Sequence, residues 1–320
     1  MLERKKAVVL GCYGQDGSII CKSLLKKGYK VIGLAKSKVD NNQRHIDLKI
    51  QDDLEVYETD IRNLTALKAF FHKNHADEVY NFAAQSSVGL SFQKPVETIE
   101  SIVNGTLNIL EIARQMSFEG KLFFAGSSEM FGETQSKAKI THPHDPKSPY
   151  ALAKQTSFKM VKLYREIYNI KCITGVLFNH ESQFRSKNFI TQKIVTGAIE
   201  CRKNQNHKIK IGNINVHRDW GWAEEYIEAI QLMVKAKSLK DQIICTGELN
   251  SLEEFIYVTF NQLNLNYKNH IIFDKKLFRE ADINRSFGDP KPIQDDLGWK
   301  AKFHMKEVIE KLIYYQLKGH

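Results

Sequence analysis

The sequence predicts an α/β protein in which a doubly wound parallel sheet is joined to a smaller mixed α/β lobe. Short apolar runs alternate with amphipathic helical patterns through the first half of the chain, and polar side chains follow several of these runs. Strands that alternate with helices at this rhythm form a parallel sheet covered on both faces. After residue 178 the rhythm breaks, so we expect the second lobe to be interleaved with the first.

The composition is that of a globular protein, with 320 residues of which 42% are hydrophobic and 26% charged. The start lacks the apolar core of a signal peptide, and no run approaches membrane-spanning length, so we expect a cytoplasmic protein without membrane contact. The cysteines are scattered, which favours reduced thiols over disulfides or a zinc site. We expect no metal.

The formal net charge of +10 comes from lysines spread along the chain. No dense basic tract or interleaved aromatic run accompanies them, so we interpret them as a solvated surface. Attraction to an anionic small molecule or to nucleic acid is the alternative, and we expect no nucleic-acid partner.

The first strand is predicted at 7–10, followed by a glycine-rich turn and a helix that ends near Gly28. Such glycines allow a tight turn, so that the helix N-terminus can meet a pyrophosphate. Glycine triplets also occur in structural turns, but this position favours a dinucleotide-binding, Rossmann-type domain. The candidate cofactor residues here are Gly11, Tyr13, Gly14, Gln15, Asp16 and Gly17.

The second strand, predicted at 31–34, is followed by Lys36, Ser37 and Lys38 where an NAD site would place an acid. Two lysines and a serine suit a 2′-phosphate, so NADP is favoured over NAD. NAD remains an alternative because Asp40 is near, and the lysines could simply solvate a loop.

Further strands are predicted at 56–59, 79–82 and 122–125, with helices through 64–71 and 99–112 between them. Ligands of such sheets lie at the carboxyl ends of the strands. Asp60 and Ile61 follow the first of these strands, Ala83, Ala84, Ser86 and Ser87 follow the second, and Ser127, Ser128 and Glu129 follow the third. We assign Asp60, Ile61, Ala83, Ala84 and Ser86 to the cofactor.

A helix that begins at Ser148 and Pro149 places Tyr150 and Lys154 on one face, one turn apart. An ammonium lowers the pKa of a nearby phenol, which suits the phenol to proton transfer at a carbinol. We expect a strand at 173–178, a polar loop at 179–193 and a helix through 194–199.

With these residues in view, the chain resembles the extended short-chain dehydrogenase/reductases and, within them, the GDP-mannose 4,6-dehydratases. The glycine and YxxxK motifs indicate only the superfamily, whereas LFNHES and the RDWG of RDWGWA resemble the GDP-sugar dehydratase branch. The matching segments cover nearly the whole chain: GCYGQDGS, YNFAAQSSVGLSFQKP, GSSEMFG, SPYALAK, LFNHES, FITQKI, RDWGWA, TGE, GDP and LGW.

The resemblance implies a lyase that converts a GDP-hexose to the GDP-4-keto-6-deoxyhexose and water while recycling its own NADP. Tyr150, helped by Lys154 and Ser127, would take the C4 hydroxyl proton during hydride transfer. Glu129 would then remove the C5 proton, and Glu129 or Ser128 would protonate the leaving C6 hydroxyl. Tyr150 and Lys154 would also contact the cofactor.

The resemblance further implies that Ser87, Glu129, Asn179, Lys193, Arg218 and Arg279 contact the GDP-sugar. It implies an NADP-binding domain at 1–178 that also receives roughly 214–246, a mainly substrate-binding lobe at 179–320, and a homodimer or homotetramer. The alternative, purely structural interpretations are that Glu129 is a helix cap or ion-pair partner and that Arg218 pairs with a surface acid. His180 is interpreted as a packed structural histidine.

Departures from the family fall where a sugar or a neighbouring subunit would touch. The family usually has Thr at 127, His at 87, Pro-Arg at 183–184, Gly-Glu at 186–187, Arg at 192, His at 222 and Pro at 280. We expect the changes at 87, 184 and 192 to reshape the pocket rim or the subunit contacts. GDP-mannose, GDP-N-acetylglucosamine and a GDP-heptose therefore stay open as substrates.

Two other functions stay open. A nucleotide-sugar C4 epimerase or 4-ketosugar reductase of the same fold would need no base at C5. A catalytically silent dinucleotide-binding sensor would need none of Ser127, Tyr150 and Lys154.

Overall fold

A computed structural model describes residues 4–39, 42–278 and 281–319. The chain forms two compact units, and each is assembled from separate stretches of sequence. Unit 1 comprises Met1–Met130, Ser148–Leu177 and Ile227–Gln242. Unit 2 comprises Phe131–Lys147, Phe178–Tyr226 and Ile243–His320.

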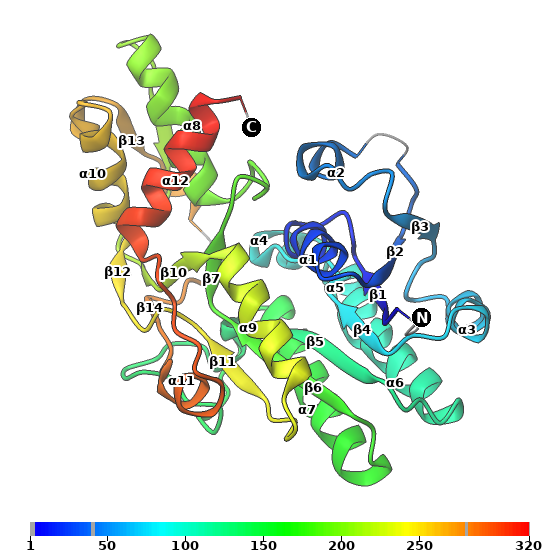
Figure 1. Ribbon diagram of the computed structural model, residues 1–320. Helices are drawn as coiled ribbons and strands as arrows, with labels where there is room; N and C mark the ends of the chain where they lie inside the picture. The colour runs from blue at the N-terminus through cyan, green and yellow to red at the C-terminus, as the bar shows by residue number, and fades with distance from the viewer. Residues whose placement is uncertain (1–3, 40–41, 279–280, 320) are drawn as a thin grey trace. The chain divides into compact units, whose positions relative to one another are not determined.

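The largest sheet has the strand order β11-β6-β5-β4-β1-β2-β3 (Figure 1). Its strands are β1 (Lys6–Leu10), β2 (Lys30–Ala35), β3 (Glu55–Glu58), β4 (Glu78–Asn81), β5 (Lys121–Ser127), β6 (Cys172–Leu177) and β11 (Gln242–Ile244). All five pairings among β1 to β6 are parallel. The order reverses direction at β1, so the predicted doubly wound α/β fold is confirmed.

Both faces of this sheet are buried. Val8 and Leu10 of β1 belong to one hydrophobic core with residues of α3, α6 and α7. Ala7 and Val9 point to the opposite face, because side chains alternate along a strand, and they are also fully buried. Burial on both faces explains why these strands read as continuous apolar runs in the sequence.

The helices of the first 177 residues are α1 (Gln15–Lys26), α2 (Gln43–Leu48), α3 (Leu64–Lys73), α4 (Val88–Gln93), α5 (Pro95–Ile99), α6 (Gly105–Gln115) and α7 (Pro149–Tyr168). The predicted single helix through 99–112 is instead α5, a π-helical segment at Glu100–Asn104 and α6. Sequence analysis missed α2 and α4, because helices of six residues carry too little periodicity to be recognised.

In unit 2, α8 (Ile190–Lys203), α10 (Leu252–Gln262) and α12 (Met305–Leu317) enclose a core that contains the buried Trp220, Trp222 and Phe255. The remaining helices are α9 (Ala223–Lys235), which continues into unit 1, and α11 (Lys291–Leu297). The strands are β7 (Asn179–Glu181), β8 (Ile209–Ile211), β9 (His217–Arg218), β10 (Trp220–Trp222), β12 (Asn250–Ser251), β13 (Ile271–Phe273) and β14 (Arg285–Ser286). They form three small sheets, β10-β7, β12-β9-β14 and β13-β8.

The predicted polar loop at 179–193 is wrong at both ends, because β7 begins it and the first turn of α8 ends it. β7 pairs in parallel with the buried strand β10. Its last two residues, His180 and Glu181, are buried rather than solvated: Glu181 is 1% exposed and accepts a hydrogen bond of 2.7 Å from the Thr191 hydroxyl. The polar composition of 179–181 therefore suggested a loop, although these residues form a strand whose Glu181 carboxylate is hydrogen bonded inside the unit.

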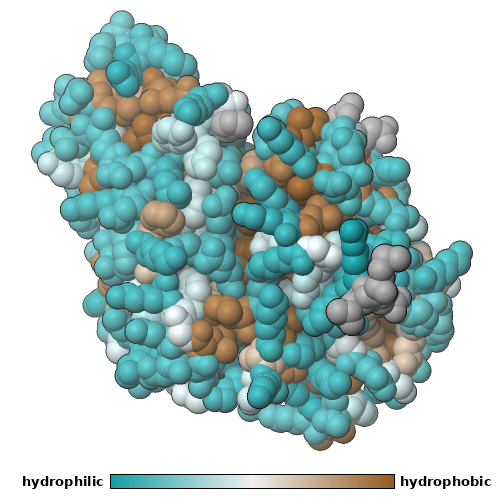
Figure 2. Space-filling model, in the orientation of Figure 1, coloured by the Kyte–Doolittle hydropathy of each residue, from teal (hydrophilic) through white to brown (hydrophobic). Residues whose placement is uncertain are grey.

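The face of the molecule in Figure 2 is mostly hydrophilic, with separate hydrophobic patches. All five cysteines are buried free thiols. Within 4–39, 42–278 and 281–319, no helix has the length and apolar character needed to cross a membrane. The same ranges hold no group of three or more His, Cys, Asp or Glu side chains that could bind a metal ion.

Candidate active site

Three predicted catalytic residues lie together at the carboxyl end of β5. The strand runs two residues further than predicted, so that Ser127 is its last residue and Ser128 and Glu129 open a 3₁₀ turn. The Glu129 N–H donates to the Ser127 hydroxyl at 3.3 Å. Ser127 and Ser128 are buried, whereas the Glu129 side chain is partly exposed. The turn thus holds two hydroxyls and one carboxylate at the end of one strand.

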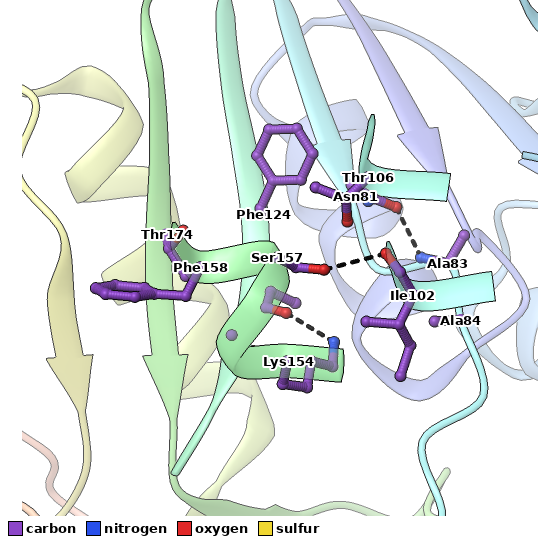
Figure 3. A pocket seen from close by; sticks show the side chains of 12 residues that line it. Asn81, Ala83, Ala84, Ile102, Thr106, Phe124, Lys154, Ser157, Phe158 and Thr174 are labelled. Carbon is purple, nitrogen blue, oxygen red and sulfur yellow. Dashed lines mark hydrogen bonds between the residues drawn. The ribbon is translucent and has the colours of Figure 1, made fainter. Parts of the chain in front are cut away.

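Tyr150 and Lys154 occupy the first turns of α7, as predicted. Ser148 caps the helix by accepting the Ala151 N–H at 3.1 Å, and Pro149 is its first residue. The Lys154 Nζ lies 5.7 Å from the centroid of the Tyr150 ring, so an ammonium stands beside the phenol. Lys154 also donates to the Ala125 carbonyl of β5 at 2.8 Å, which ties α7 to the strand that carries Ser127 (Figure 3).

Burial lowers the pKa of Lys154 from 10.5 to about 8, and the Asp16 carboxylate acts in the opposite direction. Asp16 lies in the first turn of α1, directly after the glycine-rich turn, so this predicted cofactor residue and Lys154 interact electrostatically. Lys154 also lines a cavity of about 10 Å³ together with Ser157, Thr174 and Asn81 (Figure 3). This cavity has room for one water molecule at most.

The glycine-rich turn has a backbone that only glycine permits. Gly11 has φ +80°, and a Cβ there would lie 2.8 Å from the Ala83 nitrogen. A Cβ at Gly17 would lie 2.1 Å from the Gly11 carbonyl oxygen. Gly14 precedes the first residue of α1. The turn therefore brings the helix N-terminus and the end of β4 close together, as a pyrophosphate site requires.

Sequence analysis missed two residues of α2 that contact this turn. The Arg44 Nη1 donates to the Tyr13 carbonyl at 2.9 Å. The His45 Nε2 lies 2.9 Å from the Cys12 carbonyl, and the His45 ring is tilted against the Tyr13 ring. Burial lowers the pKa of His45, so the neutral ring donates from Nε2. A lone Arg-His pair carries no motif, so only the fold reveals these contacts.

The other cofactor candidates lie at neighbouring strand ends of unit 1. Lys36 and Ser37 are exposed just after β2, and Ser86 is exposed between β4 and α4. Ala84 packs against a small hydrophobic cluster formed by Ile102, Tyr150 and Ala153. Ser87 caps α4 by accepting the Leu90 N–H. This cap gives the Ser87 hydroxyl a structural role beside the predicted substrate contact.

Asp60 and Ile61, which follow β3, are also held in place. Arg62 forms hydrogen bonds with both carboxylate oxygens of Asp60, the shortest at 2.7 Å, and lowers the pKa of Asp60. Ile61 is buried, and a Cβ at Gly105 would lie 2.4 Å from its Cδ1. This pairing of Asp60 with Arg62 could not be inferred from the sequence pattern.

Unit 2 brings two of the predicted substrate residues close together. Asn179 of β7 is paired with Trp220 of β10, and Arg218 of β9 lies two residues before Trp220. Arg218 is buried, and its Nη1 donates to the His217 carbonyl at 3.0 Å. Lys193 is exposed on α8, in the same unit.

Three positions named in the sequence analysis, Arg279, Asp40 and Glu280, lie outside the described residues. His180 is packed, as predicted: its ring is stacked on Tyr226 at 4.7 Å between centroids, and its Nδ1 lies 2.7 Å from the Phe178 carbonyl.

Two of the departures from the family lie elsewhere than expected. Phe184 is 6% exposed and Gln192 is 1% exposed, so both side chains are inside unit 2 rather than at a rim. The Gln192 amide donates to the Ser182 carbonyl at 2.9 Å and accepts from Gln316 at 3.2 Å. Both side chains are therefore part of the packed interior of unit 2.

Comparison with known proteins decides the family. Residues 8–312 match the family model described as GDP-mannose 4,6 dehydratase. The chain belongs to the GDP-mannose 4,6-dehydratase family. GDP-mannose 4,6 dehydratase 1 of Arabidopsis thaliana is 35% identical over 97% of this chain and 89% of its own length. GDP-mannose 4,6-dehydratase of Vibrio cholerae is 31% identical over 98% of this chain and 94% of its own length.

Solved structures of other nucleotide-sugar enzymes share the fold of this family member. The dTDP-glucose 4,6-dehydratase of Bacillus anthracis, in complex with NAD, has a TM-score of 0.85 at 19% identity and covers 99% of this chain and 97% of its own. The UDP-glucose 4-epimerase of Thermotoga maritima, with UDP-glucose, has a TM-score of 0.86 at 20% identity and covers 98% and 99%. The family and fold predicted from the motifs are confirmed, and the predicted dehydratase reaction agrees with the names of the relatives.

Proposed function

We propose that this chain is an NADP-dependent GDP-sugar 4,6-dehydratase, which converts GDP-mannose or a close relative such as GDP-N-acetylglucosamine to the GDP-4-keto-6-deoxyhexose and water. One observation carries the proposal. A carboxylate, Glu129, lies two residues beyond Ser127 at the end of the strand to which Lys154 of α7 is hydrogen bonded. A hydride-transfer site without a further reaction at C5 would not need this acid.

The residues of unit 1 fit a bound dinucleotide. The glycine-rich turn is tightly folded, because a Cβ at Gly11 or Gly17 would clash with the backbone of Ala83 or of Gly11. A turn of this kind lets a pyrophosphate approach the helix N-terminus. The N-terminus of α1 follows this turn directly, and the dipole of a helix N-terminus favours a bound anion. Ala83, Ala84 and Tyr150 would contact the nicotinamide half.

NADP is favoured by the cations after β2. Lys36 and Lys38 are exposed there, and Arg44 of α2 reaches the adjoining turn. Glu58, an acid of the neighbouring strand β3, accepts the Lys38 N–H at 3.1 Å and is thereby directed toward the backbone. Guanidinium and ammonium groups bind a 2′-phosphate well, whereas a ribose hydroxyl calls for an acid.

The first chemical step is proton removal from the C4 hydroxyl. Tyr150 accepts this proton, because the neighbouring Lys154 ammonium stabilises the phenolate. Ser127 donates a hydrogen bond that orients the same oxygen. A bound nicotinamide supplies the hydride acceptor for C4 and later the hydride donor for C6.

The second step is the loss of water across C5 and C6. The C4 ketone acidifies the proton on C5, and Glu129 removes it. Glu129 or Ser128 then protonates the C6 hydroxyl, which leaves as water. The later hydride addition to C6 is completed by a proton delivered to C5, which offsets the proton that Tyr150 took from the C4 hydroxyl. The partly exposed Glu129 carboxylate can exchange protons with solvent between turnovers.

The GDP-sugar is assigned to unit 2 and the cofactor to unit 1. Arg218 is the candidate for the diphosphate, since a guanidinium binds phosphate oxygens in pairs. Asn179, Lys193 and Arg279 are the candidates in unit 2 for contacts with the sugar or the nucleotide, and Ser87 and Glu129 are the sugar-contact candidates in unit 1. Which GDP-sugar is accepted depends on these side chains and on the packing behind them.

A homodimer or homotetramer is supported by an apolar stripe on α7. Leu152, Leu163 and Ile167 recur at helical spacing on its outer side and are 49%, 51% and 66% exposed. Exposed apolar surface of this kind is typical of a protein–protein contact. The five free thiols support a reducing compartment, and we assign the enzyme to the cytoplasm.

A panel of GDP-sugars tests the proposal. GDP-mannose, GDP-N-acetylglucosamine and a GDP-heptose are incubated with the enzyme and NADP, with dTDP-glucose and UDP-N-acetylglucosamine as controls. We expect a product lighter by one water from a GDP-sugar, without net NADPH. A folded enzyme that dehydrates none of them contradicts the proposal.

A further inference from the structure

A buried carboxylate lies between β9, which carries Arg218, and β10, which pairs with the strand that carries Asn179. Asp219 separates β9 from β10 and is 1% exposed. Arg218 immediately precedes it, and Trp220, which immediately follows, is paired with Asn179. The position of this one residue therefore affects Arg218 and Asn179, two of the side chains that unit 2 is proposed to offer to the substrate.

Asp219 gathers donors from two distant loops. Its Oδ1 accepts the Thr246 N–H at 2.9 Å and the Thr246 hydroxyl at 2.7 Å. Its Oδ2 accepts the Gly247 N–H at 2.7 Å, and the Gly288 N–H also donates to this carboxylate. Four donors on one buried carboxylate fix it in a single orientation, because each would cost free energy if left unpaired.

The two loops can approach only because they contain glycine. Gly247 has φ +83°, and a Cβ there would lie 2.7 Å from Pro290 Cδ. A Cβ at Gly288 would lie 2.8 Å from Cys245 Sγ. The backbone N–H groups thus reach the carboxylate through positions where a side chain would clash. The TGE and GDP motifs of the sequence, which the proposed chemistry does not use, are explained by this approach.

We propose that Asp219 is a positioning residue for the GDP-sugar, holding Arg218 and Asn179 at the geometry that binds substrate. This inference rests on the proposed function of Arg218 and Asn179 as substrate contacts. Without the carboxylate, the backbone between β9 and β10 loses its hydrogen bonds to the loops that contain Gly247 and Gly288. Substrate binding then weakens, while the proton-transfer groups at the end of β5 and on α7 are untouched.

Two variants test this role. In Asp219→Asn one oxygen becomes an NH₂ group that faces N–H donors; in Thr246→Val one donor is lost and the carboxylate stays. The matched control is Thr259→Val, which removes a hydroxyl that donates at 2.7 Å to the Phe255 carbonyl inside α10 of the same unit. Steady-state KM and kcat for GDP-mannose, and calorimetric Kd values for GDP and NADP, are measured for each.

We expect Asp219→Asn to raise the KM for GDP-mannose and the Kd for GDP by about tenfold or more, and Thr246→Val by about threefold, since charge-assisted hydrogen bonds are lost. We expect kcat and the Kd for NADP to stay within about twofold in all variants. Unchanged GDP affinity in both variants would overturn the inference, as would an equal loss in Thr259→Val. If Asp219→Asn does not fold, the GDP affinity of Thr246→Val compared with that of Thr259→Val decides whether the inference stands.

The same measurements separate this inference from the proposed function. Wild-type enzyme that binds GDP but dehydrates no GDP-sugar refutes the proposed function. In that case the ratio of GDP affinities between the variants still tests whether Asp219 positions the GDP-binding residues. Wild-type enzyme that does not bind GDP refutes both.

Discussion

Replacing Lys154 by methionine should make the protein more stable and inactive. Burial lowers the pKa of this ammonium from 10.5 to about 8. At about 1.4 kcal/mol per pKa unit, keeping the ammonium charged in the folded chain at pH 7 costs about 3 kcal/mol. Methionine avoids this cost but leaves the Ala125 carbonyl without its donor, which costs about 2 kcal/mol. We therefore expect the free energy of unfolding to rise by about 1 kcal/mol at pH 7.

The gain should depend on pH in a direction that the lowered pKa fixes. Because the folded-state pKa lies below the unfolded value, the unfolded chain binds more protons between pH 8 and 10.5. The wild-type protein therefore gains stability as the pH rises through this window. The advantage of the methionine variant is complete below the folded-state pKa of about 8 and shrinks above it.

The assay is urea unfolding of nucleotide-free protein, followed by circular dichroism at pH 7 and again near pH 10. Lys159→Met is the control, because Lys159 is an exposed lysine of the same helix, where a substitution changes stability by about 0.5 kcal/mol or less. Dehydratase turnover is measured in parallel and should fall by about a hundredfold or more in Lys154→Met only. A Lys154→Met variant less stable than both other proteins at pH 7, or a stability difference independent of pH, refutes the reasoning.

Three other substitutions test the remaining assignments. Glu129→Gln should abolish water loss and lower turnover by about a thousandfold, measured by mass spectrometry of the product, whereas an epimerase of the same fold would keep its activity. Lys36→Glu should raise the KM for NADP about tenfold relative to NAD, with Lys30→Glu at the far end of β2 as control; equal effects on both cofactors would contradict the 2′-phosphate assignment. Ile167→Asp should shift the oligomer toward smaller species in light scattering, and an unchanged mass would exclude the outer side of α7 from the subunit contact.

Much of unit 1 could be predicted because its elements follow strong local rules. β1 and β5 are continuous apolar runs, since both of their faces are buried. The turn after β1 needs glycine at Gly11, where φ is positive, and Ser148 and Pro149 mark the start of α7. Residues that follow such strands necessarily lie at the ligand-binding edge of a parallel sheet. The positions of Ser127 and Tyr150 could therefore be inferred before any coordinates.

The contacts that could not be predicted are those between elements without a local pattern. α2 has six residues, so the contacts of Arg44 and His45 with the glycine-rich turn left no mark in the sequence periodicity. In unit 2 the strands are two or three residues long, and polar residues on them, such as Glu181, form hydrogen bonds inside the unit. Asp219 appeared only as part of a motif, and its four donors from loops far along the chain became visible only in the fold.

Reaction and sugar choice depend on different kinds of structure in this chain. The proposed proton-transfer groups extend from a seven-residue strand and a twenty-residue helix. The proposed substrate groups extend from short strands whose placement depends on buried side chains such as Asp219 and Gln192. A substitution in the interior of unit 2 can therefore move a sugar contact by packing alone, while the sheet that bears Ser127 and Glu129 is unchanged. Because Gln192 and Phe184 are buried departures from the family pattern, the sugar, rather than the reaction, is what we expect them to alter.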